Sequence, residues 1–417
     1  MNAAPRTTPE AHRTACTPPA WRHLRVALLL ALCGSPGFAE PAGNPTGYEY
    51  EIPVDYETDV DAVIESKVLT PRMTFKNSSG GSVVFYGQAN PAYQMFDDGE
   101  ETTEGLVDNG NWNTRLGFRT VQPVQDNTLR FRFETALGLR SSAGISQESR
   151  PDRMDWQRTA LRWFESAYDS PYGTVSAGQG SQASDGTAGM DESFTFHAGA
   201  ADSTDGFAAF RFRDGNGELT DVTVGAVNNS FDGARRFRLR YDSPRVAGLM
   251  LSSSYGRNIL VSGDNRNYSD VALRSVNAVG DFSVQTAVGY GWEDNPDGAD
   301  QERVAGSTTV FHNPSGLNLA FSAGKLMSGP DYTYTRLGWR TDLIQCGTTS
   351  FSVDYYFGRD FLSEGARTEN YGLYAVQSVD AWSIDLYTGW RRFTYSDDLG
   401  GSYQDADSIL AGSRWFF

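Results

Sequence analysis

The sequence of 417 residues contains little cysteine and no long apolar run, and both absences exclude classes of protein. Its longest sustained apolar stretch, VALLLALCG at residues 26–34, is far shorter than the roughly 18–20 residues that a membrane-spanning helix needs. Two of the three cysteines, Cys16 and Cys33, lie near the amino terminus, so the rest of the chain keeps only Cys346. That part can form no internal disulfide and no metal cluster based on cysteine.

The amino-terminal region has the pattern of a secretory signal peptide. Four arginines precede the apolar stretch, and Gly37 and Ala39 supply the small residues that signal peptidase reads. We therefore expect residues 1–39 to be removed after Ala39 and the protein to leave the cytoplasm. The remainder has 31 basic and 51 acidic residues, a formal charge of −20 at pH 7. This excess of negative charge argues against a nucleic-acid partner.

From residue 83 onward the chain consists of segments of about ten residues with alternating apolar positions, separated by clusters of Gly, Asp, Asn, Ser and Pro. This pattern predicts strands. The sixteen predicted strands are 83–93, 112–121, 128–139, 156–165, 173–179, 234–241, 248–257, 269–279, 281–292, 302–311, 317–326, 332–341, 349–358, 368–378, 382–393 and 407–417. Residues 40–82 are acidic and weakly patterned, and we expect them to form a periplasmic extension.

The connections between these segments favour a closed membrane barrel. Tight turns alternate with longer, acid-rich links such as 94–111, 140–155 and 394–406, and neighbouring strands follow one another up and down. A strand of ten residues tilted by about 45° spans the hydrocarbon of a bilayer, and closure removes every unpaired edge. Aromatic pairs such as Tyr290 and Trp292 end the segments, where interfacial girdles belong. A soluble sandwich, the alternative, would need connections that carry strands between two sheets.

The stretch RRFRLRYDSP, residues 235–244, predicts which face of the sheet is wet. Arg236, Arg238 and Arg240 alternate with apolar side chains, so the two kinds point to opposite faces. Three arginines near the middle of a lipid-facing surface would cost on the order of 6–12 kcal/mol. We therefore expect the arginines to face a watery interior and the apolar side chains to face lipid or a neighbouring subunit.

Three motifs carry a resemblance to a known family. The carboxyl-terminal ILAGSRWFF resembles the signature that closes bacterial outer-membrane barrels, and TVSAGQGSQASDGTAGMDESF and FDGARRFRLRYDSP extend the likeness. Residues 83–417 thus resemble a Gram-negative trimeric porin, in particular one of alphaproteobacterial type. The resemblance implies an all-β, 16-stranded antiparallel barrel, three to an assembly, with the third long loop, about 181–233, folded into the lumen. FAAFRFRD and LTDVTVGAV within that loop are able to form a further hairpin, which would make eighteen strands.

Arginines recur at the predicted inward positions of four strands on one side of the barrel. These arginines are Arg115, Arg119, Arg130, Arg132, Arg158, Arg162, Arg236, Arg238 and Arg240. The long loop carries carboxylates at Asp185, Asp191, Glu192, Asp202 and Asp205. We expect cations on the wall to face carboxylates on the loop across a narrow aqueous gap, where the field favours small hydrophilic solutes. The plainer interpretation is that salt bridges only hold the loop to the wall.

The resemblance implies a general diffusion channel for small hydrophilic solutes and ions in the outer membrane, without a cofactor and without enzymatic activity. A channel specific for one sugar or anion would use the same wall. An outer-membrane hydrolase is the remote alternative, because only His197 and His312 follow the leader and no GxSxG motif accompanies them. Acid-rich outer loops are either solvated or loosely hold divalent cations that bridge lipopolysaccharide phosphates.

Overall fold

The computed structural model describes residues 73–200 and 204–417, which form strands with very little helix. The strands are β1 (Thr74–Lys76), β2 (Ser82–Ala89), β3 (Pro91–Asp97), β4 (Thr102–Asp108), β5 (Arg115–Val124), β6 (Asn127–Ala136), β7 (Leu161–Ser170), β8 (Gly173–Ser181), β9 (Arg211–Arg213), β10 (Leu219–Thr223), β11 (Arg235–Asp242), β12 (Leu249–Arg257), β13 (Asn267–Val279), β14 (Phe282–Asp294), β15 (Gln301–His312), β16 (Leu317–Leu326), β17 (Asp331–Ile344), β18 (Gly347–Arg359), β19 (Arg367–Val379), β20 (Ile384–Ser396) and β21 (Ala406–Phe416). The helical turns are η1 (Ser142–Gly144), η2 (Arg158–Ala160), α2 (Thr204–Phe207), α3 (Val224–Val227) and η3 (Asp380–Trp382). Within the described ranges, no helix is long and apolar enough to cross a membrane.

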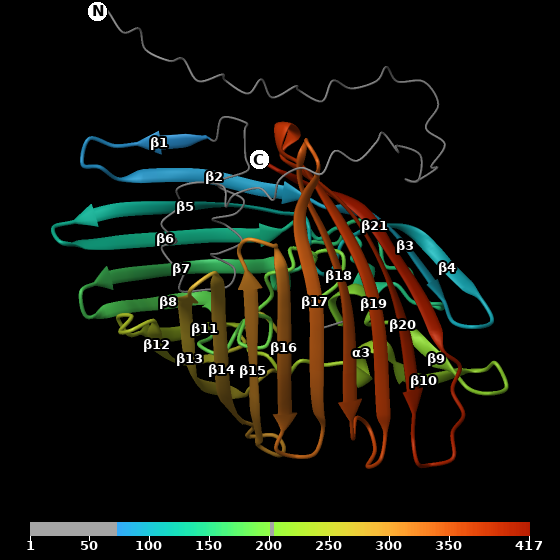
Figure 1. Ribbon diagram of the computed structural model, residues 1–417. Coiled ribbons are helices and arrows are strands. Elements are labelled where there is room, and N and C mark those ends of the chain that lie inside the picture. The colour runs from blue at the N-terminus through green and yellow to red at the C-terminus, as the bar shows by residue number, and fades with distance from the viewer. Residues whose placement is uncertain (1–72, 201–203) are drawn as a thin grey trace, which may run out of the picture.

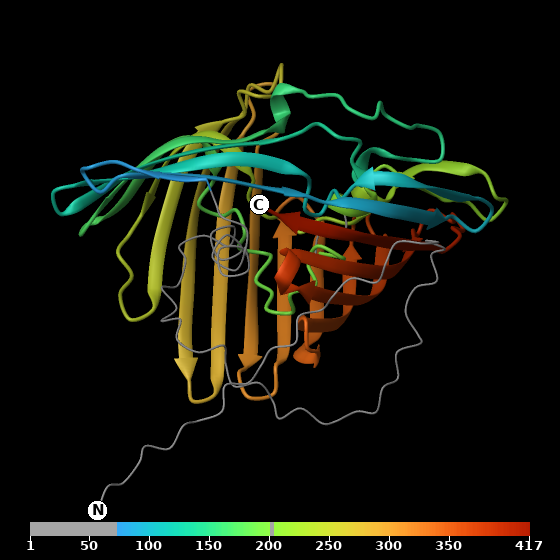
Figure 2. The ribbon, with the colours of Figure 1, turned by 90° about the horizontal axis from the view of Figure 1, so that it is seen from above.

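The large sheet closes into a barrel with sixteen antiparallel wall strands. Figures 1 and 2 show the course of these strands around the barrel. β2 and β3 follow each other as one wall strand, in which β2 pairs with β5 and β3 pairs with β4. β4 and β5 form the next wall strand in the same way. The last strand, β21, pairs with β3 and with the end of β2 and so closes the ring. The predicted strand number of sixteen is confirmed.

The predicted extra hairpin exists but does not enlarge the barrel. β9 and β10 pair only with each other and form a separate two-stranded sheet. The prediction of a long link over 94–111 is wrong, because β3 continues to Asp97 and β4 begins at Thr102. Asp98 accepts hydrogen bonds from the backbone amides of Glu100 and Glu101 and thereby closes a tight turn between the two strands.

The sheet also begins earlier than expected. β1 lies within the stretch that the sequence assigned to the extension, and it pairs with the first residues of β2. The predicted leader and residues 40–72 lie outside the described residues.

The two faces of the wall differ as the alternating sequence predicts. Along β11, Phe237, Leu239 and Tyr241 are 47%, 59% and 42% exposed on the outer face. Arg238 and Arg240, in the gaps, are each only 4% exposed and point into the barrel. β12 repeats the alternation over its whole length. The arginine side of this strand is therefore inside, and its apolar side is outside.

The long loop, residues 182–234 between β8 and β11, lies inside the barrel behind β15–β20 in Figure 1. It has an apolar core of its own, shared with the inner face of the wall. Phe210 stacks on Phe96 of β3 with ring centroids 4.1 Å apart, and Phe231 stacks on Phe361 at 5.6 Å. Burial of several aromatic side chains, worth about 1.5–3 kcal/mol each, holds the loop against the wall.

Leu273 lies in the middle of β13 with its side chain 42% exposed on the outer face. We expect Leu273→Arg to lower the free energy of unfolding by about 2–4 kcal/mol, because a guanidinium at the bilayer midplane must leave water. Val279→Arg, at the short-turn end of the same strand, should cost only about 0–1 kcal/mol. Reversible urea unfolding in lipid vesicles measures both. Equal losses for the two variants would contradict the membrane placement of this face.

Candidate functional site

The inner wall between β2 and β11 carries eight of the nine predicted arginines. Arg158 is the exception, because its predicted position on the inner wall is wrong. β7 begins at Leu161 rather than at 156, so Arg158 lies in the exposed turn η2 before the strand. Arg162 still points inward, because the pairing of β6 with β7 shifts register between Glu134 and Thr135. A shift of this kind re-aims the side chains of the bulged strand.

Three of these arginines converge on one carboxylate that the sequence analysis did not single out, Glu134 of β6. Arg162 Nε and Arg132 Nη2 lie 2.6 Å and 2.9 Å from its oxygens, and Arg115 Nε lies at 3.6 Å. The Tyr86 hydroxyl donates to the same carboxylate at 2.8 Å. Glu134 is 1% exposed, whereas the side chains of Arg132 and Arg162 keep 15% and 11% of their surface exposed. We use the name Glu134 cluster for Glu134, Tyr86, Arg115, Arg119, Arg132 and Arg162.

Arg119 completes this cluster over the ring of Tyr86. Its guanidinium lies 6.0 Å from the ring centroid, and that of Arg132 lies 5.8 Å away on the same ring and 4.3 Å from Trp163. Aromatic faces attract guanidinium groups through the ring quadrupole. The cluster therefore presents four positive charges and one negative charge among the described residues.

The remaining predicted arginines bind carboxylates or carbonyls of the wall. Arg238 contacts Glu165 at 2.5 Å, and Arg240 contacts Asp242 at 2.9 Å. Both also donate to the Ser181 carbonyl, where the long loop begins. Arg130 contacts Asp169 at 2.6 Å near the short-turn end, and the guanidinium of Arg236 lies 4.3 Å from the ring centroid of Tyr268.

Of the five predicted loop carboxylates, the three whose side chains the structure describes have partners other than these nine arginines, which differs from the expected arrangement. Asp191 contacts Arg336 of β17 at 2.6 Å, and Glu192 contacts Arg340 of the same strand at 3.4 Å. Asp185 accepts a hydrogen bond from Ser181 at 2.6 Å. The loop thus pairs with the opposite wall, whose arginines sequence reasoning missed. Asp202 lies outside the described residues, and the side chain of Asp205 is likewise not described.

Arg336 is the centre of a buried ionic network between loop and wall. It contacts Asp354 at 2.9 Å and donates to the Gly199 carbonyl, and Arg391 contacts the same Asp354 oxygen at 2.5 Å. Arg336 is 1% exposed, and Arg391 donates to the carbonyl of Ala200 at 3.0 Å. Two arginines, two carboxylates and loop carbonyls pair with one another here, as buried charges require, although the Nε atoms of Arg336 and Arg391 have no hydrogen-bond partner among the described residues.

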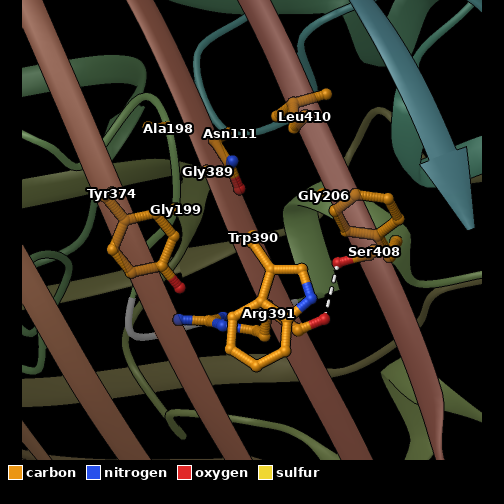
Figure 3. A pocket seen from close by; sticks show the side chains of 11 residues that line it. Asn111, Ala198, Gly199, Gly206, Tyr374, Gly389, Trp390, Arg391, Ser408 and Leu410 are labelled. Carbon is orange, nitrogen blue, oxygen red and sulfur yellow. Dashed lines mark hydrogen bonds between the residues drawn. The ribbon is translucent and has the colours of Figure 1, made fainter. Parts of the chain in front are cut away.

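The loop fills this side of the barrel almost completely. Figure 3 shows Ala198 and Gly199 of the loop beside Tyr374 and Arg391 of the wall. The cavity between them measures about 10 Å³, room for about one water molecule. At this point the described loop residues and the wall thus leave room for little more than one water molecule.

The space on the other side of the loop remains accessible to water. Between residues 182 and 199 of the loop, the partly exposed residues are Asp185, Gly186, Gly189, Asp191 and Glu192. A Cβ at Gly189 would meet no atom within 4 Å, so this edge faces open space. The Glu134 cluster is partly exposed as well. The aqueous lumen consequently has an acidic loop edge and an arginine-rich wall, although the two do not touch.

The first turn of the loop is held by Asp232, whose carboxylate accepts from the amides of Gly186 at 2.8 Å and Ala188 at 3.2 Å. Burial and the neighbouring charge of Asp185 raise the pKa of Asp232 to about 7. Because the pKa of Asp232 is higher in the folded protein than in the unfolded chain, its protonated form favours the folded state. This contribution to the free energy of unfolding is fully present below the ordinary pKa of a carboxyl group and is lost as the pH rises through 7. The turn is therefore held more firmly at pH 5 than at pH 8.

We expect the hydrogen-exchange protection factors of the Gly186 and Ala188 amides to be larger at pH 5 than at pH 8. Asp232→Asn should remove this difference, because its amide side chain does not titrate. Asp214→Asn, in an exposed turn, is the control and should preserve it. Protection that is independent of pH in the unmodified protein would contradict the assignment.

The two histidines named in the sequence analysis lie in different surroundings, and no metal site was found among the described residues. No group of three or more His, Cys, Asp or Glu there is placed to hold a metal ion. Ser193 donates to Asp191 at 2.8 Å, and Ser193 and His197 are both fully buried. His312 lies within hydrogen-bonding distance of the Ser315 hydroxyl, 2.7 Å from its Nδ1. The ring of His197 packs against Phe196 and Tyr387.

A closed barrel of sixteen strands with a charged lumen and an inserted loop defines a channel of the bacterial outer membrane. The family model described as Gram-negative porin matches residues 65–398, and the chain belongs to this family. It is thus an outer-membrane protein whose lumen allows diffusion. The alphaproteobacterial type and the cleavage after Ala39 remain predictions.

Solved structures show the same fold at low sequence identity. The anion-selective porin from Comamonas acidovorans is 15% identical with a TM-score of 0.55, over 81% of this chain and 100% of that chain. The outer-membrane channel DcaP of Acinetobacter baumannii is 14% identical with a TM-score of 0.53, over 82% and 99%. The trimer form of OmpT from Vibrio cholerae is 14% identical with a TM-score of 0.51, over 81% and 99%. The search of curated protein sequences found no match.

Proposed function

We propose that the protein is a general diffusion porin without enzymatic activity, and that small hydrophilic solutes and ions pass between the acidic loop edge and the Glu134 cluster. The observation that carries the proposal is the placement of the loop. It fills the β19–β21 side and leaves charged, partly exposed groups around the remaining lumen. A lumen lined by opposed charges orders water and makes its displacement by an apolar solute costly.

Recording from planar bilayers tests this function. The conductance of the purified protein should rise in proportion to salt concentration, and no single sugar or anion should block it with saturation. Saturating block by one solute would instead support a specific channel, the second candidate. That candidate is favoured by the stacked arginine and aromatic side chains of the Glu134 cluster, which offer both charge and a flat apolar face. A protein that inserts into the bilayer but carries no current would overturn both.

We also propose a homotrimer in contact with outer-membrane lipid and lipopolysaccharide. The wall presents an apolar outer face that suits lipid and a neighbouring copy equally, and OmpT from Vibrio cholerae has been solved in a trimer form. Among the acidic outer-loop residues, Asp98 contacts Arg213 of β9 at 2.8 Å. The loop acids as a group are Asp97, Asp98, Glu100, Glu101 and Glu104. We propose further that these loops loosely bind divalent cations and that the protein has no cofactor.

A further inference from the structure

The outer face of the wall is hollowed between β16 and β20, strands that follow one another around the barrel in Figure 1. The hollow measures about 540 Å³ and is lined mainly by apolar side chains. The small side chains of Ala375 and Thr388, register partners on β19 and β20, form its floor. Phe351 and Trp339 continue the same row towards β17, and Trp390 stands two positions from Thr388 on the same face. The hollow is therefore an apolar groove with aromatic walls.

Two arginines stand directly opposite each other at the long-loop end of the same face. Arg359 of β18 and Arg367 of β19 are register partners, and both are exposed. Arg359 donates to Asp331 through Nε and Nη2, whereas Arg367 forms no ion pair among the described residues. Like charges directly opposite in a sheet destabilise the pairing. A phosphate between the two guanidinium groups removes this repulsion and accepts charge-assisted hydrogen bonds from both.

A tyrosine pair lies between the opposed arginines and the groove. Tyr355 and Tyr371, on the same two strands, pack with ring centroids 5.1 Å apart. Both hydroxyl groups donate to Glu369, so this carboxylate is bonded to the tyrosines and forms no ion pair with Arg367 among the described residues. Tyrosines of membrane proteins gather at the level of the lipid head groups. The arginines therefore lie at or above the head groups, and the groove lies in the hydrocarbon.

The distance between the arginines and the groove fits the depth of one lipid leaflet. Leu373 and Ala375, which line the groove, follow Arg367 by six and eight positions in β19. At about 3.4 Å per residue and a tilt of about 45°, the groove lies about 14–19 Å below the arginines along the membrane normal. Half of the hydrocarbon core is about 15 Å thick. Acyl chains of a lipid whose head group is at the arginines therefore reach the groove.

We propose that this face binds lipopolysaccharide, with a phosphate of its lipid A part between Arg359 and Arg367 and one acyl chain in the groove. The inference rests on the proposed contact with outer-membrane lipid and gives that contact a site. Charge complementarity favours this occupant, because a phosphorylated and acylated lipid supplies both the anion and the chain at the spacing found here. Long loops of outer-membrane barrels are extracellular, so the arginines lie in the leaflet that contains lipopolysaccharide.

The first test measures lipid binding to the purified full-length protein by native mass spectrometry, with diphosphorylated and dephosphorylated lipid A as probes. The unmodified protein should bind the phosphorylated probe at least about tenfold more tightly, because only this probe accepts charge-assisted hydrogen bonds. The double variant Arg359→Ser, Arg367→Ser should lose this preference. Arg257→Ser, which removes an exposed arginine from the outer face of β12, is the control and should keep it. Equal binding of the two probes by the unmodified protein would overturn the proposal.

The second test fills the groove and keeps the face apolar. Ala375→Trp should weaken binding of the phosphorylated probe at least about tenfold, because displaced methylene groups lose their burial. Ala323→Trp, on the outer face of β16 but outside the lining of the groove, should bind like the unmodified protein. Unchanged binding by Ala375→Trp would overturn the proposal.

Two further results concern the occupant and the channel. Phosphatidylglycerol bound as tightly as phosphorylated lipid A, or loss of the trimer without loss of lipid in Ala375→Trp, would overturn lipopolysaccharide as the occupant. Lipid binding as expected by a protein that carries no current would support the lipid site and overturn only the diffusion function.

Discussion

Arg336→Met is expected to lower the free energy of unfolding by about 3–5 kcal/mol, because it removes one partner from a buried ionic network and leaves charge without compensation. Asp191 and Asp354 both lose the guanidinium that lies 2.6 Å and 2.9 Å from their oxygens. The Gly199 carbonyl of the loop loses a donor as well. The first half of the loop should consequently loosen from β17.

Three measurements check this expectation. Urea unfolding in vesicles gives the stability, limited proteolysis reports on cleavage within residues 182–234, and single-channel recording should show a noisier current. Arg359→Met is the matched control. Arg359 contacts Asp331 at 2.8 Å, but its side chain is 56% exposed, and exposed pairs contribute only about 0–1 kcal/mol. If Arg336→Met unfolds at the same urea concentration as the control, the network does not hold the loop.

Glu134→Gln is expected to move the reversal potential of the channel towards anions and to lower stability by about 3–5 kcal/mol. The variant keeps the size and the hydrogen-bonding capacity of the side chain but removes the carboxylate on which Arg115, Arg132 and Arg162 converge. Charges at the lumen outweigh distant loop charges, because screening at physiological salt acts over about 8 Å. Removing one negative charge from the wall should therefore make the field that a passing ion experiences more positive.

The control for Glu134→Gln is Glu302→Gln. Glu302 lies on the outer face of β15, where it accepts a hydrogen bond from Tyr290. Its substitution changes the net charge of the protein by the same amount outside the lumen. We expect no shift of the reversal potential in this control under an asymmetric salt gradient. Equal selectivity of the Glu134 and Glu302 variants would show that the cluster does not face the path of the ions.

The sequence predicted the strands of the wall well because their alternation has a simple physical cause. Each side chain on a membrane strand faces either lipid or the interior, so arginine and phenylalanine cannot share a face. This reasoning placed Arg238 and Arg240 inside and Phe237 outside. It failed at Arg158 because a strand boundary there moved by five residues, and the alternation carries no information outside a strand.

The charge pairs were beyond the reach of sequence reasoning. Asp191 and Arg336 are 145 positions apart, and only the path of the loop decides which wall its carboxylates meet. That path follows from the packing of apolar loop residues, such as Phe210 on Phe96, against the inner wall. The aromatic run FTFHAG and the segment FAAFRFRD were the available signals that this loop has a core of its own.

The sequence by itself determined the strands of the sheet and their wet and apolar faces, because alternation and turn chemistry act locally along the chain. The inserted loop was implied by the family resemblance, and the sequence left eighteen strands open beside sixteen. Only the tertiary structure decided that the loop packs against one side of the lumen, that Glu134 gathers three arginines, and that Met73 and Phe417 both bond to β2. These features depend on contacts between residues far apart in the sequence, and such contacts form only when the barrel has closed.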